Sequence, residues 1–116
     1  TLQKSLAAMF TQANVLNINI DDSLDIANNI KNNISNAQPL DLTGCDLKDI
    51  LYFIDNNVPV ITQISQGKYV LLTGYNATKI YYYDGAGNAT LNVSQNALQE
   101  EISDEGSCFI TYRIVK

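Results

Sequence analysis

The sequence predicts an α+β domain in which N-terminal helices pack on an antiparallel sheet. The first half of the chain carries apolar residues at helical spacing, and the second half is rich in β-branched and aromatic residues. Helical and extended segments scarcely alternate, which disfavours a parallel sheet. With 116 residues, 46% of them hydrophobic, the chain can form one domain with a buried core. We therefore treat residues 1–116 as a single domain.

Two helices are expected before residue 40. The first spans residues 2–12, where apolar side chains recur every three or four positions. The second follows residues 21–23, Asp-Asp-Ser, which are candidate N-caps, and its apolar stripe extends to Ile34. Pro39 then breaks the chain.

A third helix is expected between Gly44 and Asn56. Asp46 and Asp49 lie in its first turns, where the helix dipole favours negative charge. Pro59 prevents the helix from continuing. Its buried side should consist of four apolar residues: Leu47, Ile50, Leu51 and Ile54.

Three strands in meander order are expected next. Turn residues around Gly67 and Asn76 separate segments that are rich in Val, Ile, Leu and Tyr. Strands joined by such short turns pair antiparallel. The three strands are expected at residues 58–64, 68–75 and 79–83.

The C-terminal third should complete the sheet. A short strand is expected over residues 90–93, followed by a helix that Ser94 caps and that ends near Ile102. Residues 108–115 alternate between apolar and polar side chains, which predicts the last strand.

Charge and composition exclude several classes of partner. The net charge of −5 disfavours binding to nucleic acid or to an anionic membrane. No apolar run approaches the ~20 residues of a membrane span. The chain begins at Thr1 and shows no signal peptide, so we expect a segment of a longer protein.

The two cysteines, Cys45 and Cys108, leave two alternatives open. A disulfide between them would close a long loop and stabilise the fold by about 4 kcal/mol. Two separate thiols are an equally good interpretation, since free cysteine is often buried.

Three segments together resemble a known family. Residues 67–75, GKYVLLTGY, and residues 80–84, IYYYD, match a run of Gly-His-Tyr-Val-Val, a Gly-Tyr turn and a strand ending in Asp. Residues 42–61 match the helix and strand before that run, and residues 4–10, KSLAAMF, match the helix after the nucleophile. The chain thus resembles the papain-like cysteine peptidase domain of the bacteriocin-processing (double-glycine leader peptidase) type.

The resemblance implies a degenerate active site. It places Thr1 at the position of the nucleophilic cysteine, Lys68 at that of the histidine and Asp84 at that of the third partner. The family mechanism needs an imidazole to accept the thiol proton. A lysine ammonium is protonated at neutral pH and cannot do so. In the family fold the last two positions lie on neighbouring strands, so Lys68 and Asp84 can form a salt bridge in place of the His–Asp pair.

The whole chain contains no histidine. Cys45 and Cys108 therefore have no imidazole partner, and most zinc and transition-metal sites are removed by the same absence. We expect no metal and no cofactor. The candidate binding residues are Tyr69, Tyr75 and Tyr83, which could line a groove; the favoured alternative is that such strand tyrosines pack on the core or coat the open face.

These patterns predict a pseudo-cysteine-peptidase: a non-catalytic module of a secreted or envelope-associated protein from a Gram-positive bacterium. Its expected partners are a peptide segment or other domains of the parent protein, or its role is purely structural. One alternative is an active hydrolase that uses Thr1 as an N-terminal nucleophile with Lys68 and Asp84. Another is that the true nucleophile precedes Thr1.

Overall fold

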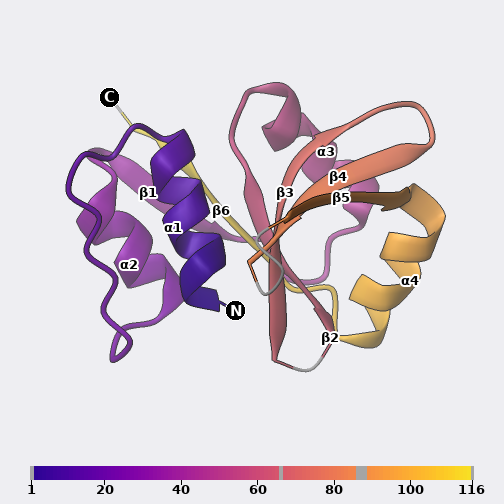
Figure 1. The fold of residues 1–116 in the computed structure, drawn as a ribbon, viewed down its shortest axis with the longest axis horizontal. Coiled ribbons are helices and arrows are strands. Elements are labelled where there is room, and N and C mark those ends of the chain that lie inside the picture. The colour runs from indigo at the N-terminus through magenta and orange to yellow at the C-terminus, as the bar shows by residue number, and fades with distance from the viewer. Residues whose placement is uncertain (1, 66, 86–88, 116) are drawn as a thin grey trace.

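The computed structural model describes residues 2–65, 67–85 and 89–115 (Figure 1). It has the mixed helical and extended composition that the sequence predicts. The elements in chain order are α1 (Leu2–Gln12), α2 (Ile26–Asn33), β1 (Ala37–Asp41), α3 (Leu47–Asp55), β2 (Val60–Ser65), β3 (Lys68–Tyr75), β4 (Lys79–Asp84), β5 (Ala89–Ser94), α4 (Gln95–Asp104) and β6 (Phe109–Ile114).

The strands form one antiparallel sheet in the order β1-β6-β2-β3-β4-β5. The expected meander of β2, β3 and β4 is confirmed, with Val60 opposite Leu72 and Leu72 opposite Tyr82. The last strand, β6, lies between β1 and β2, because Ile110 pairs with residues of both strands. The C-terminal strand thus joins the N-terminal region to the meander.

Strand β1 was not expected from the sequence. Pro39 was interpreted as a break, but it lies inside β1 opposite Tyr112. Proline lacks the N–H that a strand with two neighbours would need, and it is tolerated at the edge of a sheet. β1 is such an edge strand, since it neighbours β6 alone.

The N-cap of α2 also differs from the expectation. Residues 21–23 were the candidates, but Asp25 is the N-cap, and its carboxylate accepts a 2.8 Å hydrogen bond from the Asn28 amide. Asp21 is instead hydrogen-bonded to the side chain of Asn29. The loop before α2 therefore extends to Asp25, beyond the expected capping residues 21–23.

The other helices agree closely with the expectation. α1 has the predicted bounds, and α3 ends before Asn57, whose positive φ of 62° is the left-handed conformation common after a helix. Ser94 caps α4 by accepting a 3.0 Å hydrogen bond from the Ala97 amide.

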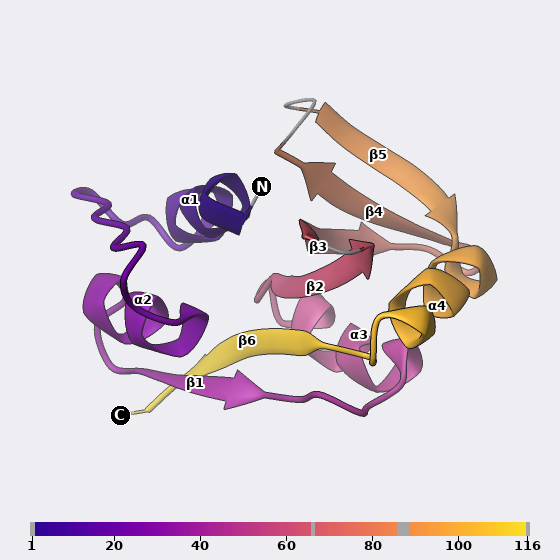
Figure 2. The same cartoon turned by 90° about the horizontal axis from the view of Figure 1, so that it is seen from below.

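The sheet separates two hydrophobic cores, and successive residues of β3 and β4 point to opposite sides. Leu72 and Tyr82 belong to the α3/α4 core, together with Ile50 of α3 and Leu98 of α4. Leu71 belongs to the α1/α2 core, which is built on Leu6, Met9, Phe10, Ile30 and Tyr112. Figure 2 shows the α1/α2 pair at one end of the molecule and α4 at the other.

Candidate functional site

Lys68 and Asp84 form a salt bridge, as the resemblance implied. Lys68 begins β3 and Asp84 ends the neighbouring strand β4, and the Lys68 Nζ lies 3.2 Å from the Asp84 Oδ2. The carboxylate is the sheltered partner: its side chain is 10% exposed, against 42% for Lys68. A pair with one partner this exposed stabilises a fold only modestly, by about 1 kcal/mol or less.

The ion pair lies at the rim of the α3/α4 core, close to the buried ring of Tyr82. Burial raises the pKa of Tyr82, while the charge of Lys68 lowers this pKa and the charges of Glu101 and Asp84 raise it. The alternation of side chains along β3 agrees with this position of Lys68, since Lys68, Val70 and Leu72 point to the side of the α3/α4 core. Tyr69 points to the other side and contacts the α1/α2 core.

The N-terminal half of α1 is fixed against the start of β3 and the end of β4. The buried Ser5 hydroxyl donates a 3.0 Å hydrogen bond to the carbonyl of Tyr69. A Cβ atom on Gly85 would lie only 2.4 Å from the Lys4 Cβ, so Gly85 permits a close approach of helix and strand. Helix α1 thus contacts the strands that carry Lys68 and Asp84. Thr1, which the resemblance places at the nucleophile position, lies outside the described residues.

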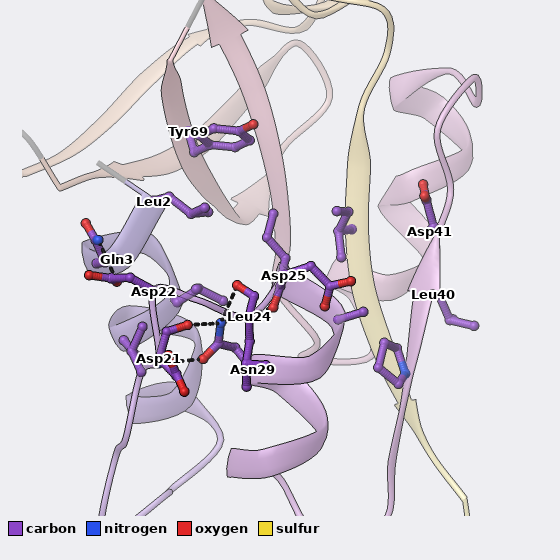
Figure 3. A pocket seen from close by; sticks show the side chains of 16 residues that line it. Leu2, Gln3, Asp21, Asp22, Leu24, Asp25, Asn29, Leu40, Asp41 and Tyr69 are labelled. Carbon is purple, nitrogen blue, oxygen red and sulfur yellow. Dashed lines mark hydrogen bonds between the residues drawn. The ribbon is translucent and has the colours of Figure 1, made fainter.

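A pocket of about 520 Å³ opens beside the start of α1 (Figure 3). Its walls come from α1, from the loop before α2, from α2, from the end of β1, and from Tyr69 and Ile110. Neither Lys68 nor Asp84 lines this pocket. The residues that line it are Leu2, Gln3, Leu6, Ile20, Asp21, Asp22, Leu24, Asp25, Ile26, Ala27, Asn29, Pro39, Leu40, Asp41, Tyr69 and Ile110.

Four aspartates are the charged residues among the described residues of the pocket, and none of these described residues is a lysine or an arginine. Hydrogen bonds from Ser23 lower the pKa of Asp21, and hydrogen bonds from Thr43 lower the pKa of Asp41. Both carboxylates therefore stay ionised at neutral pH. The other two are Asp22, which accepts a 2.7 Å hydrogen bond from the Gln3 amide, and Asp25, the N-cap of α2.

Asn29 holds the acidic loop in place. Asn29 is only 3% exposed. Its side-chain amide donates hydrogen bonds to the backbone carbonyls of Asp21, Leu24 and Asp25 at 3.0–3.3 Å. Its carbonyl oxygen accepts from the Asp21 amide at 2.9 Å. Sequence reasoning missed this role, because one asparagine among many carries no signal until the loop is seen folded around it.

The three candidate tyrosines do not share one pocket. Tyr69 lines the pocket beside α1, whereas Tyr83 lines a separate hollow with Lys4, Ala7, Ala8 and Thr11 of α1. The Tyr75 hydroxyl donates to the Asp55 carboxylate at 2.8 Å near the end of α3. Of the three candidate tyrosines, Tyr69 is thus the one that lines the pocket beside α1.

Cys45 and Cys108 are free thiols, both half-buried, so the disulfide alternative is not seen in the structure. Burial raises the pKa of Cys108, a hydrogen bond with Thr43 lowers it, and the charge of Asp41 raises it. In the described part of the chain, no three His, Cys, Asp or Glu side chains come together as a metal site would require. Within the same residues, no helix combines the length and the apolarity that crossing a membrane requires.

The arrangement of helices and antiparallel strands is similar to the fold of a C39-like peptidase. The crystal structure of a proposed C39-like peptidase from Bacillus anthracis matches with a TM-score of 0.74 and 15% sequence identity. The match covers 97% of this chain and 88% of the other. No protein-family model matches the sequence, and a search of curated proteins finds no similar sequence.

Proposed function

We propose that this chain is a catalytically inactive, papain-like peptidase domain that binds a peptide segment. The observation that supports the proposal is the ion pair between Lys68 and Asp84, at the positions where the resembled family has histidine and aspartate. As the domain of a secreted or envelope-associated Gram-positive protein, it would hold a segment of its parent protein or of a partner.

The ion pair argues against catalysis by either route considered. Lys68 contacts the Asp84 carboxylate, and an ammonium group has no lone pair to accept a proton. A threonine hydroxyl at position 1 would then need another base. The proposal therefore assigns Lys68 a positioning role: it keeps the ends of β3 and β4 in register beside α1.

Retained binding is supported by the open pocket beside α1. A surface that served packing alone would be expected to fill with its own side chains, since protein interiors are close-packed. Here about 520 Å³ remains open, a size typical of sites for small ligands or a few peptide side chains. The apolar walls and polar edge of the pocket are those of a recognition site rather than of a packing defect.

The proposal is tested by following binding and cleavage in one mixture of short peptides. Mass spectrometry is expected to show no cleavage after prolonged incubation with the 116-residue chain, while the backbone amide NMR spectrum of the labelled chain shifts near Leu2, Leu24 and Tyr69. Specific cleavage would overturn the inactive assignment. Unchanged NMR signals with every peptide would overturn peptide binding.

A further inference from the structure

We infer that the pocket beside α1 takes a basic side chain, lysine or arginine, from the bound peptide, together with an apolar neighbour. This inference rests on the proposed peptide binding and specifies its ligand. It follows from the combination of an apolar pocket with a rim of one charge sign.

The shape and walls of the pocket suit a long side chain. Leu2, Leu24, Ile26 and Ile110 provide apolar surface, and Tyr69 adds an aromatic face. Lysine and arginine bury their aliphatic stems on such surfaces and keep the charged end at a polar edge. An aromatic ring also attracts a cation over its face.

The charge of the rim selects a cation over an anion. Asp21, Asp22, Asp25 and Asp41 contribute four negative charges, and no lysine or arginine lines the pocket in the part of the chain that the structure describes. Among the described residues the salt bridge is that of Lys68 and Asp84, so none of these four carboxylates has a lysine or arginine partner there. Four carboxylates around one pocket make its electrostatic potential negative, which favours a cationic ligand.

The hydrogen bonds of these carboxylates come from neutral groups. Among the described residues, the donors are the side-chain amide of Gln3, the backbone N–H groups of Ser23, Asn28 and Thr43, and the hydroxyls of Ser23 and Thr43. Such donors orient the carboxylates but leave their charge unneutralised. The described side chains do not cluster as metal ligands do, which favours an organic cation on a flexible stem.

The rim is also held in position before any ligand binds. Asn29 fixes Asp21, Leu24 and Asp25 through their backbone, and Gln3 links Asp22 to α1. A preformed rim spares the cost of ordering a loop upon binding. Lys68 does not oppose the incoming cation here, because it leaves β3 on the opposite side from Tyr69.

The test uses three capped heptapeptides, Ser-Gly-Leu-X-Leu-Gly-Ser, in which X is lysine, glutamine or glutamate. Binding to the 116-residue chain is measured by NMR titration at low salt. The charge-removing variant is Asp22→Asn with Asp25→Asn, because asparagine keeps both the hydrogen-bond acceptor and the N-cap. The matched control is Glu100→Gln with Glu101→Gln, which makes the same change in net charge on the exposed surface of α4.

The lysine peptide is expected to bind about tenfold more tightly than the glutamine peptide, the scale of one partly shielded charge pair, and the glutamate peptide more weakly still. Signals of Gln3, Leu24, Asn29 and Tyr69 should shift. The preference should weaken several-fold in the aspartate variant, which keeps Asp21 and Asp41, and persist unchanged in the control.

Equal affinity for the three peptides at the same pocket would overturn the inferred preference while leaving peptide binding intact. Shifts confined to the surroundings of Lys68 would overturn the assignment to this pocket. Absence of binding by all three, and by the broader peptide mixture above, would instead overturn the proposed function itself.

Discussion

The two sides of the sheet carry helix pairs of different character. On one side, α3 and α4 bury Leu47, Ile50, Leu98 and Ile102 in a continuous core, and the hollow between these helices is lined mostly by polar side chains. On the other side, α1 and α2 leave an apolar pocket with an acidic rim. One side is a closed core, whereas the other combines a core with an open pocket.

Strand β3 contributes side chains to both sides of the sheet. Residues of β3 alternate between the two sides, so that Lys68 and Val70 face the α3/α4 core while Tyr69 and Leu71 face α1. The salt bridge and the pocket therefore lie next to each other in the chain but on opposite sides of the sheet. A change at one is expected to leave the other largely unaffected.

The largest expected effect comes from deleting the same atoms on the two sides. Leu98 is 1% exposed, so Leu98→Ala should lower the free energy of unfolding by about 3–4 kcal/mol through a buried cavity. Leu24 is half-buried at the open pocket, and Leu24→Ala should cost about 1 kcal/mol or less. Urea denaturation of both variants measures the difference, and equal losses would contradict the contrast between the two sides.

A smaller effect is expected from the polar support of the pocket. Asn29→Leu keeps the approximate volume but removes four hydrogen bonds to the loop, and should cost about 1–3 kcal/mol. The Asp21 amide should then exchange its hydrogen faster than in the parent protein. Asn28→Ala is the control, since the Asn28 side chain is exposed. Unchanged exchange at Asp21 would show that Asn29 does not hold the loop.

The salt bridge should contribute less. Lys68→Met is expected to reduce the free energy of unfolding by about 1 kcal/mol at low salt, and the difference from the parent protein should shrink as salt screens the pair. Lys79→Met, at an exposed position, provides the control. A loss that exceeds 3 kcal/mol would mean that the pair supports the fold far more than its exposure suggests.

Each core contains one buried tyrosine whose titration should lower stability at high pH. Burial raises the pKa of Tyr82 in the α3/α4 core and of Tyr112 in the α1/α2 core. Since the folded state then favours the neutral phenol, stability is complete below the unfolded pKa of about 10 and falls as the pH rises through the folded values. Denaturation curves at rising pH should show this loss, and Tyr82→Phe or Tyr112→Phe should each reduce it. Stability that does not change with pH in this range would contradict the raised pKa values of Tyr82 and Tyr112.

The regular elements could largely be predicted from the sequence. The apolar spacing of α1 and the continuous β-forming run of β3 are local signals, and both elements have the expected bounds. Strand β1 could not be predicted, because its pairing with β6 joins residues about 70 positions or more apart in the chain and its proline suits an edge strand. The salt bridge was predictable because the resemblance fixed the positions of Lys68 and Asp84.

The pocket could not be predicted in the same way. Its walls come from five separate segments, and none of them has a sequence signal for binding. Residues 21–25 look like a capping sequence, and only the folded loop around Asn29 shows that their carboxylates gather at one rim. Assembly of this kind depends on tertiary packing that local patterns do not encode.

The central claim is that a peptidase scaffold carries Lys68 in place of its base. The most direct test restores the missing groups with Thr1→Cys and Lys68→His and compares this double variant with Thr1→Cys combined with Lys68→Gln, which carries no charge at position 68. The rate of alkylation of the thiol at position 1 is followed against pH by mass spectrometry, which separates it from Cys45 and Cys108. If the scaffold is that of a cysteine peptidase, the imidazole beside Asp84 should lower the pKa of the new thiol and accelerate its alkylation about tenfold at pH ~6. Identical pH profiles in the two variants would contradict the claim.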